Sequence, residues 1–385
     1  MNSKIVHFGD SLAGRIAAAA CLLVAWPLAA AEPISIEGLG DGIRHWKNGS
    51  GTDGYPAYEP GQVQEIAENL LRYQRANGGW PKDFDPLRIL SDVELTKLAA
   101  DRGREDTTFD NRATYTVVEY LAAASKQTGD ERYRDAALSG LDFILRAQYA
   151  NGGWPHTYPS KKGYYPHITI VDDVMVGVLS TLARIADAKP PFDVIDESMR
   201  TRTAEALARG ERCLLRLQVV VDGQLTAWAS QYDSVTLEPT QGRAFEPLAL
   251  VSSESVGVLR YLMNLNEPDA EVRTAIRSGV DRLERSKIVG LRIERVPAET
   301  IRYRNHTSRD DLVAVEDPQA APIWARFYAI DTNRPLMANR DGKKVYRLAD
   351  VERERRTGYS WYGAYATGLL TRDYPDWRKK WIGEP

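Results

Sequence analysis

The five-residue sequence NGGWP occurs twice in this chain, at residues 77–81 and 151–155. The preceding residues match as well, because LLRYQRANGGWP aligns with ILRAQYANGGWP. A third, degraded copy is LLRLQVVVDGQLTAW at 214–228. Recurrence at this spacing is typical of a repeated supersecondary unit. The repeat therefore constrains the fold more than any other feature of the sequence.

Each repeat predicts a helix that ends at the NGGWP sequence. Before the first copy, Val63, Ile66, Leu70 and Tyr73 fall on one face of a helix. Asn and Gly tolerate the left-handed backbone of a helix C-terminus, and the proline after the tryptophan prevents the helix from resuming. A second helix is predicted after each copy, at 113–125, 173–186 and 253–265.

Helical hairpins in series bury their apolar faces against each other, which predicts an all-α fold with a closed or arc-shaped double layer. The NGGWP loops would lie at one end, where Trp80 and Trp154 either close the hairpins or line a rim. After residue 285 the regularity fades, and DGKKVYRL at 341–348 indicates a turn and a short β-strand. Because no linker rich in Gly, Ser or Pro is present, residues 32–385 are predicted to be a single domain with long loops and minor β-structure.

Residues 1–31 have the pattern of a signal peptide. Lys4 and Arg15 precede the apolar run IAAAACLLVAW, and small residues provide a cleavage site before Glu32. The apolar run is too short to span a bilayer. We therefore expect an exported protein, periplasmic or secreted, which in its mature form is monomeric and has no membrane segment.

Composition excludes several classes of function. The formal net charge is −3, which argues against a nucleic-acid-binding protein. Cys213 is the only cysteine outside the predicted signal peptide, so no internal disulfide is expected, and its apolar helical surroundings predict a buried thiol. Arginines are nevertheless dense between 302 and 356, which is compatible with a local anion site on a mildly acidic protein.

A polar group precedes each of the second helices: Asp110-Asn111, Asp172-Asp173 and Ser252-Ser253-Glu254. Helix N-capping is one interpretation, because Asp, Asn and Ser are all good caps. A doublet needs only one cap, however, and Asp110 and Asp172 are expected at equivalent places in successive hairpins. Oxygen ligands of this kind suit Ca²⁺, whereas five histidines and one mature cysteine argue against zinc.

A second group of candidate residues is basic. Arg243 lies in the loop QGRAFEP, and Arg326 and Arg340 stand among aromatic and turn residues. Arginine holds carboxylates through two parallel hydrogen bonds. Aromatic residues at loops suit the faces of sugars: Trp80, Trp154, Trp228, Tyr359 and Trp361. Together these features predict an acidic polysaccharide as the substrate.

The motifs NGGWPK, TFDNRATYT, YYPHITIVDDVM, GRAFEPLALVSSES and ARFYAIDTNRPLMANRDG together resemble the family-10 polysaccharide lyases, which are pectate lyases. The resemblance runs from about residue 60 to the C-terminus with the motifs in consistent order. It implies an (α/α)₃ toroid, dependence on Ca²⁺ and β-elimination on polygalacturonate.

The resemblance also implies roles for individual residues. Arg243 matches the proposed base, and Arg326 and Arg340 match arginines that hold substrate carboxylates. Lys82 matches the lysine of the GGWPK motif, and with Trp80 it is assigned to substrate binding. The metal and catalytic carboxylate motifs contain Asp110, Asn111, Asp172 and Asp173, without indicating which of the last two binds the metal. This sequence departs from the pattern at Val171 and at His156, which replaces the lysine in the second repeat.

Two other functions remain open at this point. The first is an inverting glycoside hydrolase on a helical toroid, with Asp110 and Asp172 as its acid and base. The second is a non-catalytic protein that binds acidic sugars, which needs aromatic platforms but no clusters of arginines and carboxylates.

Overall fold

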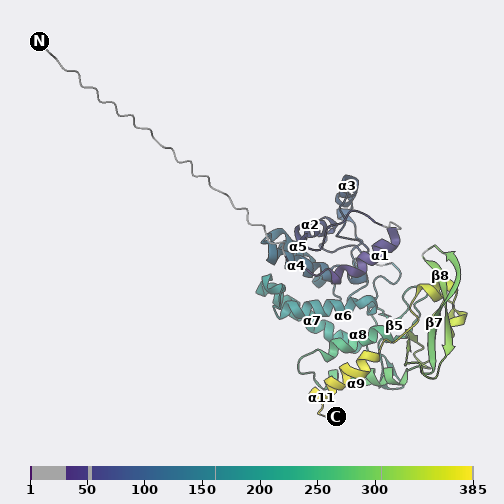
Figure 1. Ribbon diagram of the computed structural model, residues 1–385. Coiled ribbons are helices and arrows are strands. Elements are labelled where there is room, and N and C mark those ends of the chain that lie inside the picture. The colour runs from purple at the N-terminus through teal and green to yellow at the C-terminus, as the bar shows by residue number, and fades with distance from the viewer. Residues whose placement is uncertain (2–31, 51–53, 161, 305, 384–385) are drawn as a thin grey trace.

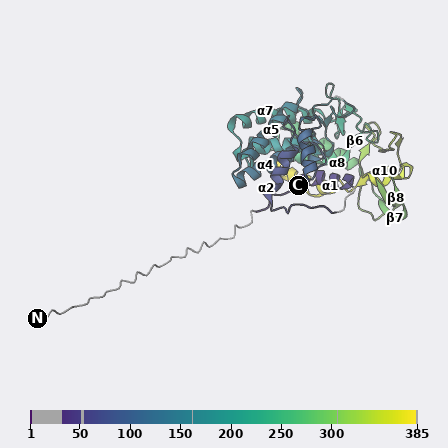
Figure 2. The ribbon, with the colours of Figure 1, turned by 90° about the horizontal axis from the view of Figure 1, so that it is seen from above.

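The computed structural model describes residues 1, 32–50, 54–160, 162–304 and 306–383. Residues 2–31 of the predicted signal peptide therefore lie outside the described residues. The chain is mostly helical, with 46% helix and 16% strand, which confirms the predicted helical class. Figures 1 and 2 show a stack of helices with a smaller β-rich part at one side.

Helices account for most of the chain up to residue 285, and short helices follow near the C-terminus. Their bounds are α1 (Gly40–Ser50), α2 (Val63–Tyr73), α3 (Asp92–Ala100), α4 (Tyr115–Thr128), α5 (Glu131–Ala147), α6 (Val174–Ala186), α7 (Glu197–Arg216), α8 (Ser252–Met263), α9 (Ala270–Arg285), α10 (Arg353–Gly358) and α11 (Tyr374–Trp381). The second helix of each predicted hairpin is therefore present, as α4, α6 and α8.

The helices form two layers. In the first layer α4 contacts α6, and α6 contacts α8. In the second layer α5 contacts both α2 and α7, and the antiparallel pairs α4/α5, α6/α7 and α8/α9 join the layers (Figure 1). The apolar face predicted for the first helix is buried, since Val63, Ile66, Leu70 and Tyr73 are all less than 9% exposed. Burial of these faces is what stabilises the double layer.

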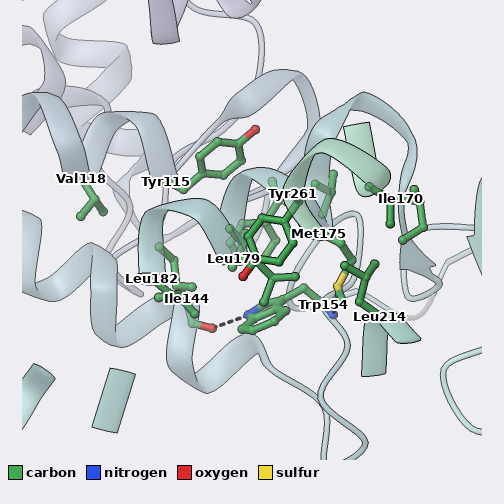
Figure 3. Packing of buried hydrophobic residues seen from close by; sticks show 14 of the residues in the cluster. Tyr115, Val118, Ile144, Trp154, Ile170, Met175, Leu179, Leu182, Leu214 and Tyr261 are labelled. Atoms are coloured by element: carbon green, nitrogen blue, oxygen red, sulfur yellow. Dashed lines mark hydrogen bonds between the residues drawn. The ribbon is translucent and has the colours of Figure 1, made fainter. Parts of the chain in front are cut away.

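The tryptophan of each repeat closes its hairpin. The indole N–H of Trp80 donates to the carbonyl oxygen of Leu70 at 2.7 Å, and Trp154 makes the same bond to Ile144 at 2.8 Å (Figure 3). Two further tryptophans repeat the bond, Trp228 to Leu214 and Trp324 to Leu283. The chain therefore contains a fourth unit of the repeat, at Trp324, which the sequence pattern did not predict.

The glutamine that precedes each loop bonds the loop to a neighbouring helix. Gln74 donates to the carbonyl oxygens of Gly78 in its own loop and Ala136 in α5. Gln148 and Gln218 make the equivalent pairs of bonds in the next two units. Each glutamine thus ties its turn to the following outer helix, which fixes the stacking of successive units.

Gly78 and Gly152 explain why the loop needs glycine. Their φ angles are 96° and 99°, and an added Cβ would lie 2.4 Å from the carbonyl oxygen of Ser139 and 2.2 Å from that of Arg209. A side chain at either position would therefore both strain the backbone and prevent the loop from contacting the neighbouring helix.

Strand structure is concentrated after residue 285 and exceeds the minor β-structure predicted. The longest element is an antiparallel hairpin of β7 (Leu291–Arg302) and β8 (Thr307–Glu316). A four-stranded sheet has the order β12-β11-β10-β6, where β6 is Leu250–Val251, β10 Phe327–Tyr328, β11 Pro335–Ala338 and β12 Lys344–Val345. The strand predicted within 341–348 is confirmed as β12.

The remaining strands are two residues long and form a three-stranded sheet of order β1-β4-β5 and two pairs, β2/β3 and β9/β13. They are β1 (Ile168–Thr169), β2 (Val220–Val221), β3 (Gln224–Leu225), β4 (Gln231–Tyr232), β5 (Pro239–Thr240), β9 (Trp324–Ala325) and β13 (Tyr362–Gly363). A separate apolar cluster lies under the β-rich part and includes Val251, Phe327, Met337 and Trp361. Within the described residues no helix is both long and apolar enough to cross a membrane. Cys213 is buried and unpaired as predicted.

Candidate active site

The polar groups that precede α4, α6 and α8 meet at the N-termini of these helices. The 3-10 helix η3 (Asp110–Arg112) contacts η4 (Val171–Asp173), and η4 contacts α8. None of the three helices has a side-chain cap, so the N-capping interpretation is wrong for all of them. The positive ends of three helix dipoles point toward the place where these carboxylates lie, and such ends favour bound anions.

The backbone at these N-termini is strained in the same way in two units. Asn111 and Arg112 have φ angles of 51° and 61°, and Asp172 and Asp173 have 56° and 58°. Residues other than glycine rarely adopt this conformation, and such residues concentrate at functional sites. By this pattern Asp172 corresponds to Asn111, so the predicted equivalence of Asp110 and Asp172 is wrong by one residue.

Asp110 is held by two basic side chains. Its Oδ2 accepts a hydrogen bond from Lys82 at 2.9 Å and lies 3.2 Å from Nε2 of His156, while Oδ1 accepts the backbone N–H of Asn111. The Asp110 side chain is only 6% exposed. Burial by itself would raise the pKa of Asp110, but His156 and Lys82 hold it well below its usual range. Asp110 is therefore a fixed negative charge.

The carboxyl group of Asp172 differs from that of Asp110 both in its partners and in the direction of its pKa shift. It has no hydrogen bond or ion pair with any residue in the described part of the chain. Burial and the nearby charge of Asp110 raise the pKa of Asp172 to about 8, against the opposing effect of Arg243 and Arg326. An unpartnered carboxyl group between charges of both signs is a candidate to bind a cation or a reacting group.

The other predicted metal ligands have protein partners. Asp173 accepts a hydrogen bond from Arg112 at 2.7 Å, and the side-chain amide of Asn111 donates to Asp83 at 2.6 Å. Across the described ranges no three His, Cys, Asp or Glu side chains are grouped as a ready metal site. Of the pair that the sequence left open, Asp172 is the one whose carboxyl group lies near Asp110, Arg243 and Arg326.

Arg243 faces the same carboxyl group from the loop before β6. Its guanidinium pairs with Glu246, which is 4% exposed and also accepts a hydrogen bond from Tyr359 at 3.0 Å. Burial tends to lower the pKa of Arg243, but Glu246 and Asp172 raise it above its ordinary value. In this state Arg243 is a cation.

The two arginines predicted to hold substrate carboxylates differ in exposure. Arg326 pairs with Glu254 in the first turn of α8, and its side chain is 16% exposed. Arg340 makes two hydrogen bonds to Glu354, at 3.1 and 2.7 Å, and is 41% exposed. Arg340 can therefore reach a ligand without leaving its partner, whereas Arg326 is mostly enclosed.

Three of the four residues that lie two positions after a repeat tryptophan contact carboxylates of the site. The four residues are Lys82, His156, Ser230 and Arg326. Lys82 and His156 both contact Asp110, and Arg326 contacts Glu254. The sequence singled out Lys82 and Arg326 separately and treated His156 as a departure. Aligning all four tryptophans is the signal that would have identified His156.

The tryptophans themselves do not form a sugar-binding surface. Trp80, Trp154 and Trp228 are fully buried, and Trp361 is 2% exposed. The assignment of Trp80 to substrate binding is therefore wrong, because its ring fills the space between helices and its N–H is used within its own hairpin. The interpretation that these rings close the hairpins is the one that the structure confirms.

Two cavities border the carboxylates. One of about 440 Å³ is lined by Asp172, Asp173 and Glu254 together with residues of α1. The other, of about 640 Å³, is lined by Lys82 and His156. Both volumes fall in the range of small-molecule binding sites, roughly 300–1,000 Å³.

Comparisons with known proteins agree with this arrangement. Residues 74–370, well over half of the chain, match the family described as pectic acid lyase. The structure is similar to that of a family 10 polysaccharide lyase from Cellvibrio cellulosa, with 31% sequence identity and a TM-score of 0.69, covering 91% of this chain and 98% of that one. It is also similar to a mutant of the Cellvibrio cellulosa enzyme in complex with trigalacturonic acid, with 31% identity, a TM-score of 0.70 and coverage of 91% and 99%. No curated protein sequence gives a significant match.

Proposed function

The chain belongs to the pectic acid lyases, family 10 of the polysaccharide lyases, and we propose that it cleaves polygalacturonate by calcium-assisted β-elimination with Arg243 as the base. Family membership confirms the resemblance found in the motifs and makes the protein a pectate lyase that acts on galacturonates. It sets aside the two alternatives, a glycoside hydrolase and a non-catalytic sugar-binding protein.

The observation that carries the proposal is that η3, η4 and α8 bring Asp110, Asp172 and Glu254 to one place. Glu254 pairs there with Arg326, and both Arg326 and Arg243 act on the pKa of Asp172. These residues come from five separate segments of the chain. The proton at C5 of galacturonate lies next to a carboxylate, so its removal places negative charge on that carboxylate. Guanidinium groups and helix N-termini arranged beforehand around it stabilise this charge in the transition state.

In the proposed reaction Arg340 and Arg326 bind carboxylates of the substrate and orient the sugar ring. Arg243 in its neutral form takes the C5 proton, the electrons of the C5–H bond form the C4=C5 double bond, and the bond between C4 and the glycosidic oxygen breaks, with that oxygen taking a proton from solvent. The product carries a 4,5-unsaturated sugar at its new end. Because Glu246 holds Arg243 in its charged form, this step requires that substrate displaces Glu246 and that the guanidinium first releases one proton to solvent. Arg243→Lys tests the assignment: nearly normal turnover with a shifted pH profile would contradict it.

Calcium would be held by Asp172 together with the side-chain oxygen of Asn111. Asp172 fits this role because its carboxyl group lacks a protein partner, and oxygen atoms of this kind are the ligands that Ca²⁺ prefers. Asp110 adds negative charge beside it, and Asp173 stays with Arg112. When bound, the ion would withdraw charge from a substrate carboxylate and make the neighbouring C–H bond more acidic.

The wider setting of the enzyme forms part of the proposal. We infer that the double layer of helices is the (α/α)₃ toroid of a single catalytic domain, residues 32–385. We also propose that the protein is exported to the periplasm or the medium, on the pattern of residues 1–31, and that it acts as a monomer. Export suits a polymeric substrate that does not enter cells.

One experiment tests the proposed reaction directly. Polygalacturonate is incubated with the purified protein, and the ultraviolet absorbance of the conjugated double bond is followed with and without EDTA. The expected result is an increase that EDTA stops and added Ca²⁺ restores. Release of reducing ends without that absorbance would show hydrolysis and overturn the elimination, and an increase that EDTA leaves unchanged would overturn only the role of calcium.

A further inference from the structure

Three guanidinium groups surround a single phenyl ring beside the site. The guanidinium carbons of Arg243, Arg340 and Arg355 lie 5.0, 5.2 and 4.7 Å from the ring centre of Phe245. The ring is 6% exposed. Its edge-to-face contact with Tyr359, at 5.4 Å and 76°, fixes its orientation. No role for Phe245 follows from the proposed mechanism.

The three arginines belong to different segments of the chain. Arg243 is in the loop before β6, Arg340 is in the turn after β11, and Arg355 is in α10. The turn lies directly on the loop, since a Cβ on Gly342 would be 3.5 Å from the carbonyl oxygen of Ala244. The turn is also tied to α10, because Oδ1 of Asn339 accepts the backbone N–H of Glu352 at 2.7 Å. Phe245 occupies the centre of this junction.

Three cations at this spacing repel each other, so the arrangement needs compensation. Two carboxylates provide part of it: Glu246 pairs with Arg243, and Glu354 makes two hydrogen bonds each to Arg340 and Arg355. The electron-rich faces of the ring provide another part, because a guanidinium over an aromatic ring is attracted by its quadrupole. The two carboxylates therefore neutralise charge, and all three guanidinium groups share one ring as a neighbour.

We propose that Phe245 is a positioning residue that fixes the spacing and orientation of Arg243 and Arg340, and through them the binding of polygalacturonate. A flexible arginine loses side-chain entropy when it binds a carboxylate. A ring that already holds both guanidinium groups removes much of that loss before substrate arrives. The inference rests on the proposed function, because it assigns Arg243 and Arg340 to contact with the substrate.

The test compares two variants of the same position. Phe245→Leu keeps an apolar side chain but removes the aromatic ring, and Phe245→Tyr keeps the ring. For Phe245→Leu we expect KM on polygalacturonate to rise by roughly 10-fold, the size of one or two lost cation–π contacts. Phe245→Tyr is expected to restore KM to within about 2-fold of the wild type.

A matched control is Phe192→Leu. Phe192 is also buried and also lies under one arginine, Arg184 at 5.2 Å, but it follows α6 at the end away from the carboxylates. Its replacement should lower the melting temperature without changing KM. If Phe245→Leu does not fold, Phe245→Met fills a similar volume without a ring and carries the same expectation.

The outcomes separate the two proposals. A wild-type enzyme that forms no unsaturated product overturns the proposed function itself. An active wild type with the same KM as folded Phe245→Leu overturns the positioning role, and so does a rise in KM that Phe245→Tyr fails to reverse. A rise in KM with rescue by tyrosine, and no change in Phe192→Leu, supports it.

Discussion

Nε2 of His156 lies 3.2 Å from Oδ2 of Asp110, the same oxygen that accepts a hydrogen bond from Lys82 at 2.9 Å. Lys82 and His156 occupy the same position in successive repeats, two residues after the tryptophan. Two units of the repeat therefore converge on a single carboxylate that belongs to the first of them. This convergence fixes the position of the Asp110 carboxylate from two units of the repeat.

Asp110→Asn should abolish most of the activity. The substitution keeps the shape of the side chain but removes the charge that Lys82 and His156 surround, and we expect kcat to fall at least about 100-fold. Stability should decrease by only about 1–3 kcal/mol, since one charged hydrogen-bonded group is lost. Steady-state kinetics and thermal melts measure both. If the fraction of activity that is lost equals the fraction of protein that is unfolded, Asp110 has only a structural role.

Calcium should act through Asp172. Ligand binding to the native state raises the melting temperature, so Ca²⁺ added after EDTA treatment should stabilise the wild type and leave Asp172→Asn unchanged. Asp173→Asn is the matched control, because its carboxylate is already paired with Arg112, and it should still respond. An equal response of the wild type and Asp172→Asn would place the ion elsewhere.

Arg340→Ala should weaken substrate binding with little effect on folding. The side chain is 41% exposed, and loss of one bidentate contact to a carboxylate should raise KM about 10-fold. Arg134→Ala in α5 is a control of similar exposure, at 39%, and should leave KM unchanged. If KM of Arg340→Ala is unchanged on polygalacturonate, Arg340 binds no substrate carboxylate. The same conclusion holds if KM rises by the same factor on fully methyl-esterified pectin.

Trp80→Phe should affect stability and not catalysis. The indole is fully buried and donates to Leu70, so its replacement should cost about 1–3 kcal/mol from the lost hydrogen bond and the small cavity. Denaturant unfolding measures the change. KM should stay at the wild-type value, and a substantial rise would restore the discarded role of Trp80 in binding.

Glu354 makes a pH-dependent contribution to stability. Burial would raise the pKa of Glu354, but Arg340 and Arg355 lower it to about 2. Because the pKa in the folded state lies below that in the unfolded state, about 4.3, the stabilisation is complete above pH ~5 and declines as the pH falls toward 2. Glu354→Gln should therefore have a free energy of unfolding about 1–3 kcal/mol lower than that of the wild type at pH 6. This difference in free energy should be smaller at pH 3. A difference independent of pH would mean that the charge of Glu354 is not responsible.

The repeated hairpins could be predicted because their signals are local. Apolar spacing appears in each hairpin, and the first two also share an Asn-Gly-Gly turn and a glutamine six residues before the tryptophan. These signals lie in neighbouring residues, and the helices follow them closely. The fourth unit escaped prediction because β7 and β8 are inserted between α9 and Trp324, so the spacing from helix to tryptophan no longer repeats. The hydrogen bond from Trp324 to Leu283 is the same as in the other units, although 41 residues separate the partners.

By itself the sequence determined the helical class, the family and the types of residue that the site requires. It could not determine which of those residues meet, because Asp110, Asp172, Arg243 and Arg326 lie on segments whose distance in space depends on how whole helices stack. The exposure of a side chain also depends on the tertiary structure. Trp80 is fully buried and Arg340 is exposed, although both lie beside turns in the sequence. The chemistry of a side chain is local, but its partners, exposure and pKa depend on neighbours that only the packed fold brings to it.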